Sequence, residues 1–225
     1  MNKSIICFDF ETSHTDPHLC DIHQLAALCI DPVSLEVVPN SIFNSFSQPD
    51  DLNKPGYYEK FKSTIDCHCG NYKCTVDQYL DKLRQAPPEK IVWGQFIEYL
   101  RQYHDDGASS KTVFTAPIPA GANIINFDLI IIKRLCEKYK AITKPKEIFF
   151  NRDVRDITNI CSLWLGPLGL KSFSMDNLRE YFGIPKEGSH DALKDIMDEA
   201  AILRKFLKLH RTLAEKIQFK DSFNV

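Results

Sequence analysis

The stretch Ser4-Ile5-Ile6-Cys7-Phe8-Asp9-Phe10-Glu11-Thr12 decides how this chain can fold. Its first five residues form a short apolar run, which predicts a buried strand, and two acids follow at the end of that strand. Residues two apart on a strand point to the same side, so the Asp9 and Glu11 carboxylates would lie side by side. Such neighbours repel each other unless a cation joins them. The pair by itself fits a metal site and a pair of solvated acids equally well.

Further strands, and then helices, extend this core along the chain. The runs 24–30 and 36–46 predict strands, and three successive strands with an apolar first one indicate the centre of a mixed sheet. Beyond Ala122 strand and helix patterns alternate, and Ser174 and Gly183 suit the two ends of one helix. The order predicts an α/β fold in which helices flank a mixed β-sheet. The predicted helices are 126–139, 154–165, 175–182 and 191–215, with a strand at 148–150.

Residues 47–111 have a different character, because prolines punctuate them and no strand pattern continues through them. Helical patterns stand out at 76–85 and 89–104, and a polar loop follows. We interpret 47–111 as an insertion of helices and loops rather than an independent domain. The chain is therefore predicted to be a single domain over 1–225 with this insertion inside it.

The composition excludes several classes of protein. The chain has 225 residues, of which 44% are hydrophobic, enough for one sizeable core. It carries 28 basic and 30 acidic residues, a net charge of −2, which excludes a binder that relies on a large excess of Lys and Arg. No run of about 18 apolar residues is present, so we expect no membrane-spanning helix. The charge is uneven, since residues 1–110 carry −7 and residues 111–225 carry +5.

Eight cysteines are many for a chain without signs of export. The apolar run near the N-terminus ends at Asp9 and does not form a signal-peptide core, so we expect a cytoplasmic protein with reduced thiols. Three of the thiols, Cys67, Cys69 and Cys74, lie close together but lack the spacing of a common zinc finger. A surface loop of thiols is favoured over a structural zinc site, and both interpretations stay open.

Three later residues complete a set of four acids and one histidine. Asp128 stands at a predicted helix start, and His190 precedes a helix whose first turn carries Asp195. Each alone fits a cap or a surface residue, but four acids in this order offer the oxygen ligands that divalent cations take. Two such ions roughly 3.5–4 Å apart activate a water and stabilise the leaving oxygen of a phosphodiester. His190 would then accept the proton of that water.

The ordered segments Phe8-Asp9-Phe10-Glu11-Thr12, Asn126-Phe127-Asp128 and His190-Asp191-Ala192-Leu193-Lys194-Asp195 resemble the DEDDh family of 3′→5′ exonucleases, in the ribonuclease H-like superfamily. The resemblance spans nearly the whole chain. It implies that Asp9, Glu11, Asp128 and Asp195 hold two Mg²⁺ or Mn²⁺ ions, that His190 is the base, and that Phe10 and Thr12 contact the terminal nucleotide. It also implies water attack on the last phosphodiester at single-stranded DNA or RNA 3′ ends, with release of nucleoside 5′-monophosphates.

Further substrate contacts are expected from the residue types near these motifs. Asn123 and Asn126 precede Asp128, and their amides can hold a sugar or a phosphate, although they also suit a turn. Eight basic residues lie between Lys133 and Arg155. Such a stretch is usually a solvated helix face, but its place between two catalytic segments favours a phosphate track. Within it, Arg152 and Arg155 are the expected substrate contacts.

A closer likeness is to the DexA-like exonucleases of large tailed bacteriophages, which would place the protein in a host cytoplasm. It rests on Ser63-Thr64-Ile65-Asp66, on Phe150-Asn151-Arg152-Asp153-Val154-Arg155-Asp156 and on the compact segment 190–195. In that family the Thr-Ile stretch continues into tryptophans, whereas Cys67-His68-Cys69 follows here. The sequence is compatible with three functions: an exonuclease on single-stranded DNA, a ribonuclease that trims RNA ends, and a non-catalytic binding module. The intact set of acids disfavours the last, and both a monomer and a homodimer are compatible with the resemblance.

Overall fold

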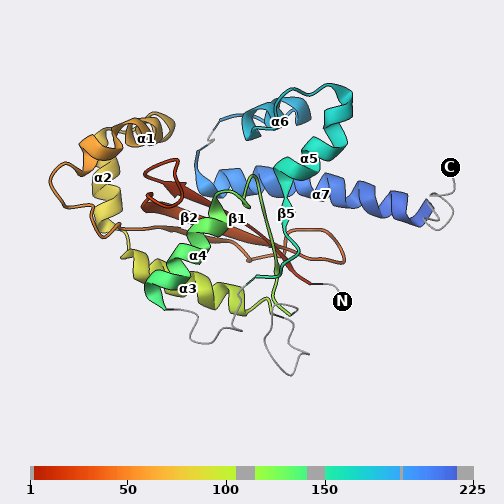
Figure 1. The fold of residues 1–225 in the computed structure, drawn as a ribbon, viewed down its shortest axis with the longest axis horizontal. Helices are drawn as coiled ribbons and strands as arrows, with labels where there is room; N and C mark the ends of the chain where they lie inside the picture. Colours follow the sequence, from red (N-terminus) through yellow and green to blue (C-terminus); the bar gives the residue numbers. More distant parts are fainter. Residues whose placement is uncertain (1–2, 105–114, 141–149, 188–189, 217–225) are drawn as a thin grey trace.

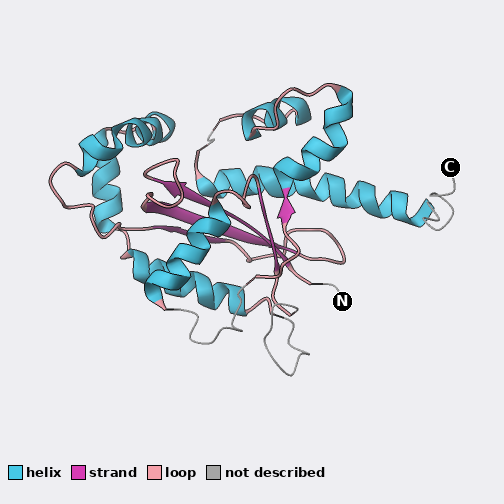
Figure 2. Ribbon diagram, viewed as in Figure 1, coloured by secondary structure: helices cyan, strands magenta, loops and turns pink. Residues whose placement is uncertain are grey.

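The computed structural model describes residues 3–104, 115–140, 150–187 and 190–216. Within these ranges three strands come first, and helices dominate the rest of the chain (Figures 1 and 2). The elements are β1 (Ile5–Thr12), β2 (Ile22–Ile30), β3 (Phe43–Phe46), α1 (Tyr57–Tyr72), α2 (Val76–Gln85), α3 (Glu89–Arg101), β4 (Ile118–Gly121), α4 (Asp128–Tyr139), β5 (Arg155–Asp156), α5 (Ile157–Leu165), the short helix η1 (Gly166–Leu168), α6 (Met175–Phe182) and α7 (Ala192–Lys216).

Strand β1 is the centre of a five-stranded mixed sheet with the order β3-β2-β1-β4-β5. It pairs antiparallel with β2 and parallel with β4, while β3 and β5 form the edges. The register places Asp9 opposite Ala26 and Glu11 opposite Gln24. A mixed sheet with flanking helices confirms the predicted α/β class. Because β1 continues through Thr12, both acids lie inside the strand rather than after it.

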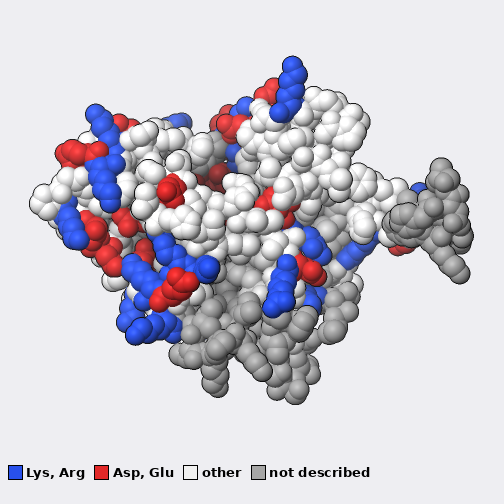
Figure 3. Space-filling model, viewed as in Figure 1, with Lys and Arg blue, Asp and Glu red and all other residues white. Residues whose placement is uncertain are grey.

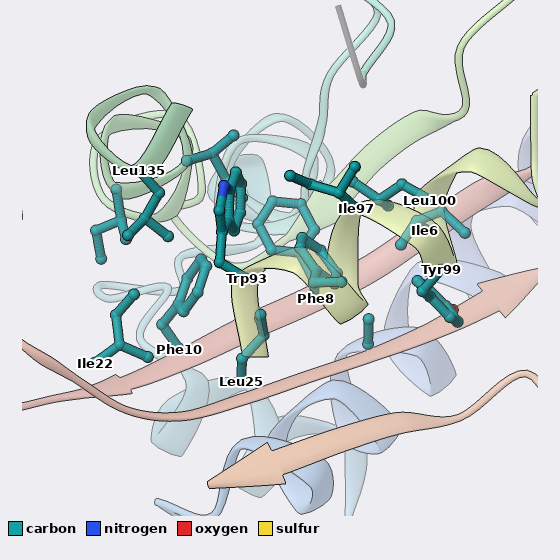
Figure 4. Close-up of a cluster of buried hydrophobic side chains, with 14 of the residues drawn as sticks. Ile6, Phe8, Phe10, Ile22, Leu25, Trp93, Ile97, Tyr99, Leu100 and Leu135 are labelled. Carbon is teal, nitrogen blue, oxygen red and sulfur yellow. The ribbon is translucent and has the colours of Figure 1, made fainter. Parts of the chain in front are cut away.

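Alternation along β1 divides its side chains between two layers of helices. Ile6, Phe8 and Phe10 point into a core shared with α3 and α4 (Figure 4). Ile5 and Cys7 point into the opposite core, which is built with α5, α6 and α7. Since successive residues of a strand face opposite sides, the two acids lie on the α7 side of the sheet. Burial on both faces explains why β1 begins as a continuous apolar run.

Helices α1 and α2 form a small core of their own at one end of the sheet, here called the α1–α2 lobe (Figure 1). Its buried side chains include Tyr57, Phe61, Ile65 and Leu83. Helix α3 instead packs into the main core, where Trp93 is buried. The predicted insertion therefore divides into two parts, a lobe beside the sheet and a helix that covers the sheet.

The expectation of a surface loop of thiols at 67–74 is wrong, because α1 runs through the segment to Tyr72. Tyr57, Phe61, Ile65 and Cys69 recur every four residues, and this spacing places them on one buried face of the helix. Two cysteines and a glycine near the end of the pattern resemble a loop composition and obscure the periodicity. The tertiary contacts of the lobe select the helix.

Other boundaries are confirmed or corrected by the structure. Helices α2 and α6 have the predicted bounds, and the Ser174 side chain accepts a hydrogen bond at the start of α6. The strand expected at 36–46 shortens to β3, since Asn40 adopts a left-handed backbone with φ 59° that interrupts it. Strands β4 and β5 have only four and two residues, too few for a recognisable pattern. The strand expected at 148–150 lies outside the described residues except for Phe150, which stacks on Phe8 in the core.

None of the helices in the described ranges is long and apolar enough to cross a membrane.

Candidate metal centre

Three carboxylates meet where β1 ends and α7 begins. One oxygen atom each of Asp9, Glu11 and Asp195 lies within 4.8 Å of the others. Strand β1 supplies the first two from one face, and the first turn of α7 supplies the third. Acidic atoms are visible at the bottom of the notch between the α1–α2 lobe and the side formed by α5 and α6 (Figure 3). Clustered carboxylate oxygens are the ligands that hard divalent cations take.

Two further acids, Asp128 and Glu199, are buried around this trio. Asp128 is the first residue of α4 and is 2% exposed, and its Oδ1 is buried without a hydrogen-bond partner among the described residues. Glu199 is 3% exposed, and its Oε2 is likewise buried and unpartnered in the part of the chain described. Sequence analysis did not identify Glu199. The available signal is its place one helical turn after Asp195, which puts both acids on one face of α7.

Burial and mutual repulsion raise the pKa values of these acids. Burial, followed by the charges of Asp128 and Glu199, raises the pKa of Asp9 well above its usual range. Burial is also the main reason that the pKa of Glu11 rises to about 8 and that of Asp128 to about 7. The positive charge of Arg179 opposes the rise in the pKa of Glu11 and of Glu199. One guanidinium cannot balance five carboxylates, so the donor set fits bound divalent cations.

Arg179 is the basic residue that holds Asp195 in place. Its side chain is 2% exposed, and its Nη2 donates to Asp195 Oδ1 at 2.6 Å. Its Nε donates to Asp198 Oδ2 at 2.8 Å, and Lys194 also pairs with Asp198. This ion-pair network joins α6 to the first two turns of α7. It therefore orients one of the three clustered carboxylates.

His190, the expected base, lies at the rim of the carboxylate cluster. Its backbone N–H donates to Asp195 Oδ2 at 3.3 Å, and its φ is 62°, in the left-handed region. The residue is exposed to solvent. The structure therefore places His190 beside a clustered carboxylate through its backbone and leaves the imidazole accessible from outside.

The expected contacts at Phe10 and Thr12 differ in accessibility. The Phe10 ring is 4% exposed and lies in the main core, on the face of β1 opposite the acids. An aromatic contact between this ring and a nucleotide would require the core to open. Thr12 is buried as well, with its hydroxyl donating to the backbone oxygen of His14 at 2.9 Å. Strand alternation explains the position of Phe10, since its neighbours on either side are the two acids.

The expected polar and basic contacts lie near the start of α4 and at β5. Asn126 Nδ2 donates to Asn123 Oδ1 at 2.9 Å, and both amides are exposed in the turn before Asp128. Arg152 is exposed, and Arg155 is half-buried in β5. The residue after Arg155 is buried Asp156, which caps α5. The two amides and Arg152 are therefore exposed to solvent, whereas Arg155 is only partly so.

The basic stretch 133–155 does not act as one continuous surface in the described residues. Lys138 on α4 pairs with Glu89 at 2.6 Å and with Asp50 at 2.8 Å. Arg134 donates to the backbone oxygen of His18 at 3.2 Å. Residues 141–149 of the stretch lie outside the described ranges. Part of the positive charge therefore joins α4 to neighbouring elements.

The three closely spaced cysteines do not gather into a metal site. Cys67 is exposed, Cys69 is buried and Cys74 is half-buried. Within the described ranges, the acidic trio at β1 and α7 is the set of potential ligands that comes close enough for one ion. A zinc site at the cysteines is therefore not supported.

Comparison with known proteins gives no match to a protein-family model and no match to a curated protein. Solved structures do share the fold. Cell-death related nuclease 4 (CRN-4) superposes with a TM-score of 0.60 at 18% identity, over 92% of this chain and 64% of that one. Exonuclease I of E. coli, solved in complex with a dT13 oligonucleotide, gives 0.62 at 17% identity over 95% of this chain.

A third structure is that of a 3′-exonuclease, solved for its 3′-end specific recognition of a histone mRNA stem-loop. It gives a TM-score of 0.61 at 15% identity, over 92% of this chain and 82% of that one. In contrast, the chain spans only 43% of E. coli exonuclease I and slightly less than two thirds of CRN-4. At these identities the similarity establishes a fold that is shared with exonucleases.

Proposed function

We propose that the chain is a metal-dependent 3′→5′ exonuclease. In this proposal it hydrolyses the terminal phosphodiester of single-stranded nucleic acid, with DNA preferred, and releases nucleoside 5′-monophosphates. The observation that carries the proposal is the cluster of Asp9, Glu11 and Asp195 oxygens within 4.8 Å. The fold shared with exonucleases supports it. Burying like charges together is costly unless cations join them, so the cluster is better explained by a cation site than by stability.

The residues fit two divalent cations, Mg²⁺ or Mn²⁺. Asp9, Glu11, Asp128 and Asp195 would hold them, and the buried, unpartnered Oδ1 of Asp128 is an acceptor that a cation would satisfy. When bound, such ions activate a water and stabilise the leaving oxygen of a phosphodiester. The DEDDh subtype is part of the proposal, because His190 stands five residues before Asp195 at the accessible rim of the cluster.

The chain's own residues have the remaining roles in the proposed reaction. His190 accepts the proton of the attacking water on its imidazole, which solvent can reach. Arg179 keeps the Asp195 carboxylate oriented through the 2.6 Å ion pair. Arg152 and Arg155 are proposed to contact backbone phosphates, together with the amides of Asn123 and Asn126. Phe10 and Thr12, both buried, are proposed to contact the terminal nucleotide, Thr12 partly through its backbone.

A ribonuclease is the second candidate, favoured by one specific observation. The chain covers 82% of the 3′-exonuclease that was solved for recognition of a histone mRNA stem-loop, against 43% of E. coli exonuclease I. The likeness to DexA-like bacteriophage exonucleases favours DNA and rests on the segments 63–66, 150–156 and 190–195. The complete set of four acids disfavours a non-catalytic binding module, which would have no need of it.

The test uses matched DNA and RNA oligonucleotides, labelled at either end, with Mg²⁺ and with chelator. A 3′ label should appear as mononucleotide, and a 5′ label should shorten stepwise. Asp9→Asn and Asp195→Asn should abolish turnover, whereas Asp77→Asn, at an exposed acid on α2, is the matched control. Full activity of either site variant, or product formation in chelator, contradicts the proposal. Preferential cleavage of RNA would select the second candidate.

A second experiment tests the base. His190→Ala should slow the chemical step in single-turnover measurements while oligonucleotide binding is retained, because its role is proton transfer rather than anchoring. An unchanged single-turnover rate removes His190 from the mechanism and leaves the metal site as the proposal.

A further inference from the structure

Helix α1 of the α1–α2 lobe carries two polar side chains that reach the carboxylate site. His68 and Tyr72 are four residues apart and therefore lie on one face of the helix. His68 contacts the end of β1, and Tyr72 contacts the residue that precedes α7. These are the two segments that supply Glu11 and Asp195. One helix of the lobe thus touches both sides of the candidate metal centre.

His68 faces the end of β1 with both ring nitrogens. Its Nε2 lies 3.0 Å from the backbone oxygen of Thr12, and because a carbonyl oxygen only accepts, Nε2 must carry the hydrogen. Its Nδ1 lies 3.7 Å from Glu11 Oε2 and has no hydrogen-bond partner among the described residues. The ring stacks on Tyr79 with centroids 5.4 Å apart and an interplanar angle of 18°. The imidazole therefore holds the Thr12 backbone and lies against the Glu11 carboxylate.

Tyr72 joins the neighbouring strand to the start of α7. Its hydroxyl lies 2.7 Å from Gln24 Oε1 and 3.0 Å from Asp191 Oδ2, both of them acceptors. Gln24 is the residue opposite Glu11 in the sheet. Asp191 follows His190, and its Oδ1 accepts a hydrogen bond from the backbone N–H of Leu193 at 3.1 Å, in the first turn of α7. The hydroxyl therefore links the strand beside the acids to the turn that carries His190.

The position of α1 relative to the sheet is itself fixed by buried hydrogen bonds. His23 on β2 is fully buried, with its Nε2 3.0 Å from the Tyr57 hydroxyl and its Nδ1 3.0 Å from the Tyr79 hydroxyl. Tyr57 begins α1, and Tyr79 belongs to α2. Buried polar contacts of this kind are costly to leave unsatisfied, so the lobe has one preferred placement. A rigid placement is what a positioning role requires.

We infer that His68 and Tyr72 are positioning residues that fix the end of β1 and the turn before α7 relative to each other for catalysis. The inference rests on the proposed exonuclease function and assigns a role to the α1–α2 lobe. The competing explanation is that the two side chains only stabilise the packing of the lobe. In that case their loss would lower stability without changing turnover by the folded protein.

The test compares four variants of the full chain. Tyr72→Phe removes one hydroxyl and keeps the ring that packs between Phe46 and Tyr79. Tyr58→Phe is the matched control, because it removes a hydroxyl from the same helix that bonds Asp66 at 2.9 Å, at the surface. His68→Leu removes both ring nitrogens, and His68→Gln restores an N–H donor near the place of Nε2. Each is measured for its thermal midpoint, for kcat and KM on the oligonucleotide, and for the rise in midpoint that Mn²⁺ causes.

We expect Tyr72→Phe and His68→Leu to lower kcat about tenfold, the effect of one lost hydrogen bond to a charged or buried partner. KM and the folded fraction at the assay temperature should stay as in the wild type. Tyr58→Phe should match the wild type, and His68→Gln should recover part of the loss. His68→Leu should also reduce the rise in thermal midpoint that Mn²⁺ causes. Unchanged kcat in folded Tyr72→Phe, or an equal loss in Tyr58→Phe, overturns the inference.

Failure of the proposed function gives a different result. A wild-type chain that releases no nucleotide contradicts the exonuclease, and the Mn²⁺ shift then still tests His68 at the cation site. An equal shift in His68→Leu and Tyr58→Phe would overturn the positioning role there. If His68→Leu does not fold, His68→Gln and Tyr72→Phe decide by the same measurements.

Discussion

Replacing Arg179 with methionine should destabilise the metal-free protein by about 3 kcal/mol, because removing one partner of a buried ion pair leaves an uncompensated charge. The guanidinium is 2% exposed and pairs with Asp195 at 2.6 Å and with Asp198 at 2.8 Å. Both carboxylates are themselves largely buried. Methionine has a similar length and keeps most of the apolar contact. We place the loss at the low end of the range for buried pairs, since Lys194 remains beside Asp198.

The assay is urea unfolding at pH 7 in chelator, with Arg84→Met as the control. Arg84 pairs with Asp81 at the same 2.6 Å, but both side chains are exposed, at 43% and 59%. An exposed pair is worth about 0–1 kcal/mol, so the control should differ little from the wild type. The Arg179–Asp195 and Arg84–Asp81 pairs thus have equal distances and very different burial. A loss below about 1 kcal/mol for Arg179→Met would refute the reasoning, given the much larger cost expected of a broken buried pair.

Two further measurements sharpen the same prediction. Burial raises the pKa of Asp195, and the charge of Arg179 opposes that rise. The stabilisation that comes from the Arg179–Asp195 pair therefore requires an ionised Asp195 carboxylate. The difference in free energy of unfolding between the wild type and Arg179→Met should therefore become smaller as the pH falls and Asp195 takes up a proton. Mn²⁺ should recover part of the lost stability, because a bound cation supplies positive charge at Asp195. A difference that grows on acidification contradicts this account.

Three other expectations follow from the site. In chelator the thermal midpoint should fall as the pH rises from about 5 to 8. Folding raises the pKa of Glu11 to about 8 and that of Asp128 to about 7, so the folded state binds more protons than the unfolded state in that window. Saturating Mg²⁺ should reduce this dependence of the midpoint on pH, and a midpoint that rises with pH in chelator would contradict the prediction. Glu199→Gln should raise the chelator midpoint and reduce the Mg²⁺-induced rise, because it removes one of the buried like charges; a lower midpoint in chelator argues against repulsion. Gly121→Ala should lower the free energy of unfolding by about 1–3 kcal/mol through overpacking, since the added Cβ would lie 2.6 Å from Ile124 Cγ2. Urea unfolding that matches the wild type would show that the surrounding chain moves to make room for the methyl group.

Local patterns were sufficient for the central strand and for helices α2 and α6. An apolar run followed by acids at alternate positions predicts that Asp9 and Glu11 share a face, because strand periodicity depends on the chain alone. Ser174 and Gly183 likewise bound α6, because capping is a property of the residues at a helix end. Periodicity failed for α1, where cysteines and a glycine obscure the buried stripe, and for β4 and β5, which are too short to show one.

The sequence by itself determined the chemistry available at this site, namely carboxylates in a fixed order with a histidine near the last of them. Only the tertiary structure decided which other groups join them. Glu199 is buried close enough to the trio to raise the pKa of Asp9, Arg179 pairs with Asp195, and Tyr72 contacts Asp191 across 119 positions of sequence. These contacts depend on how α7, α6 and α1 pack around β1. Packing between distant segments follows from the burial of whole helix faces, and no local spacing encodes it.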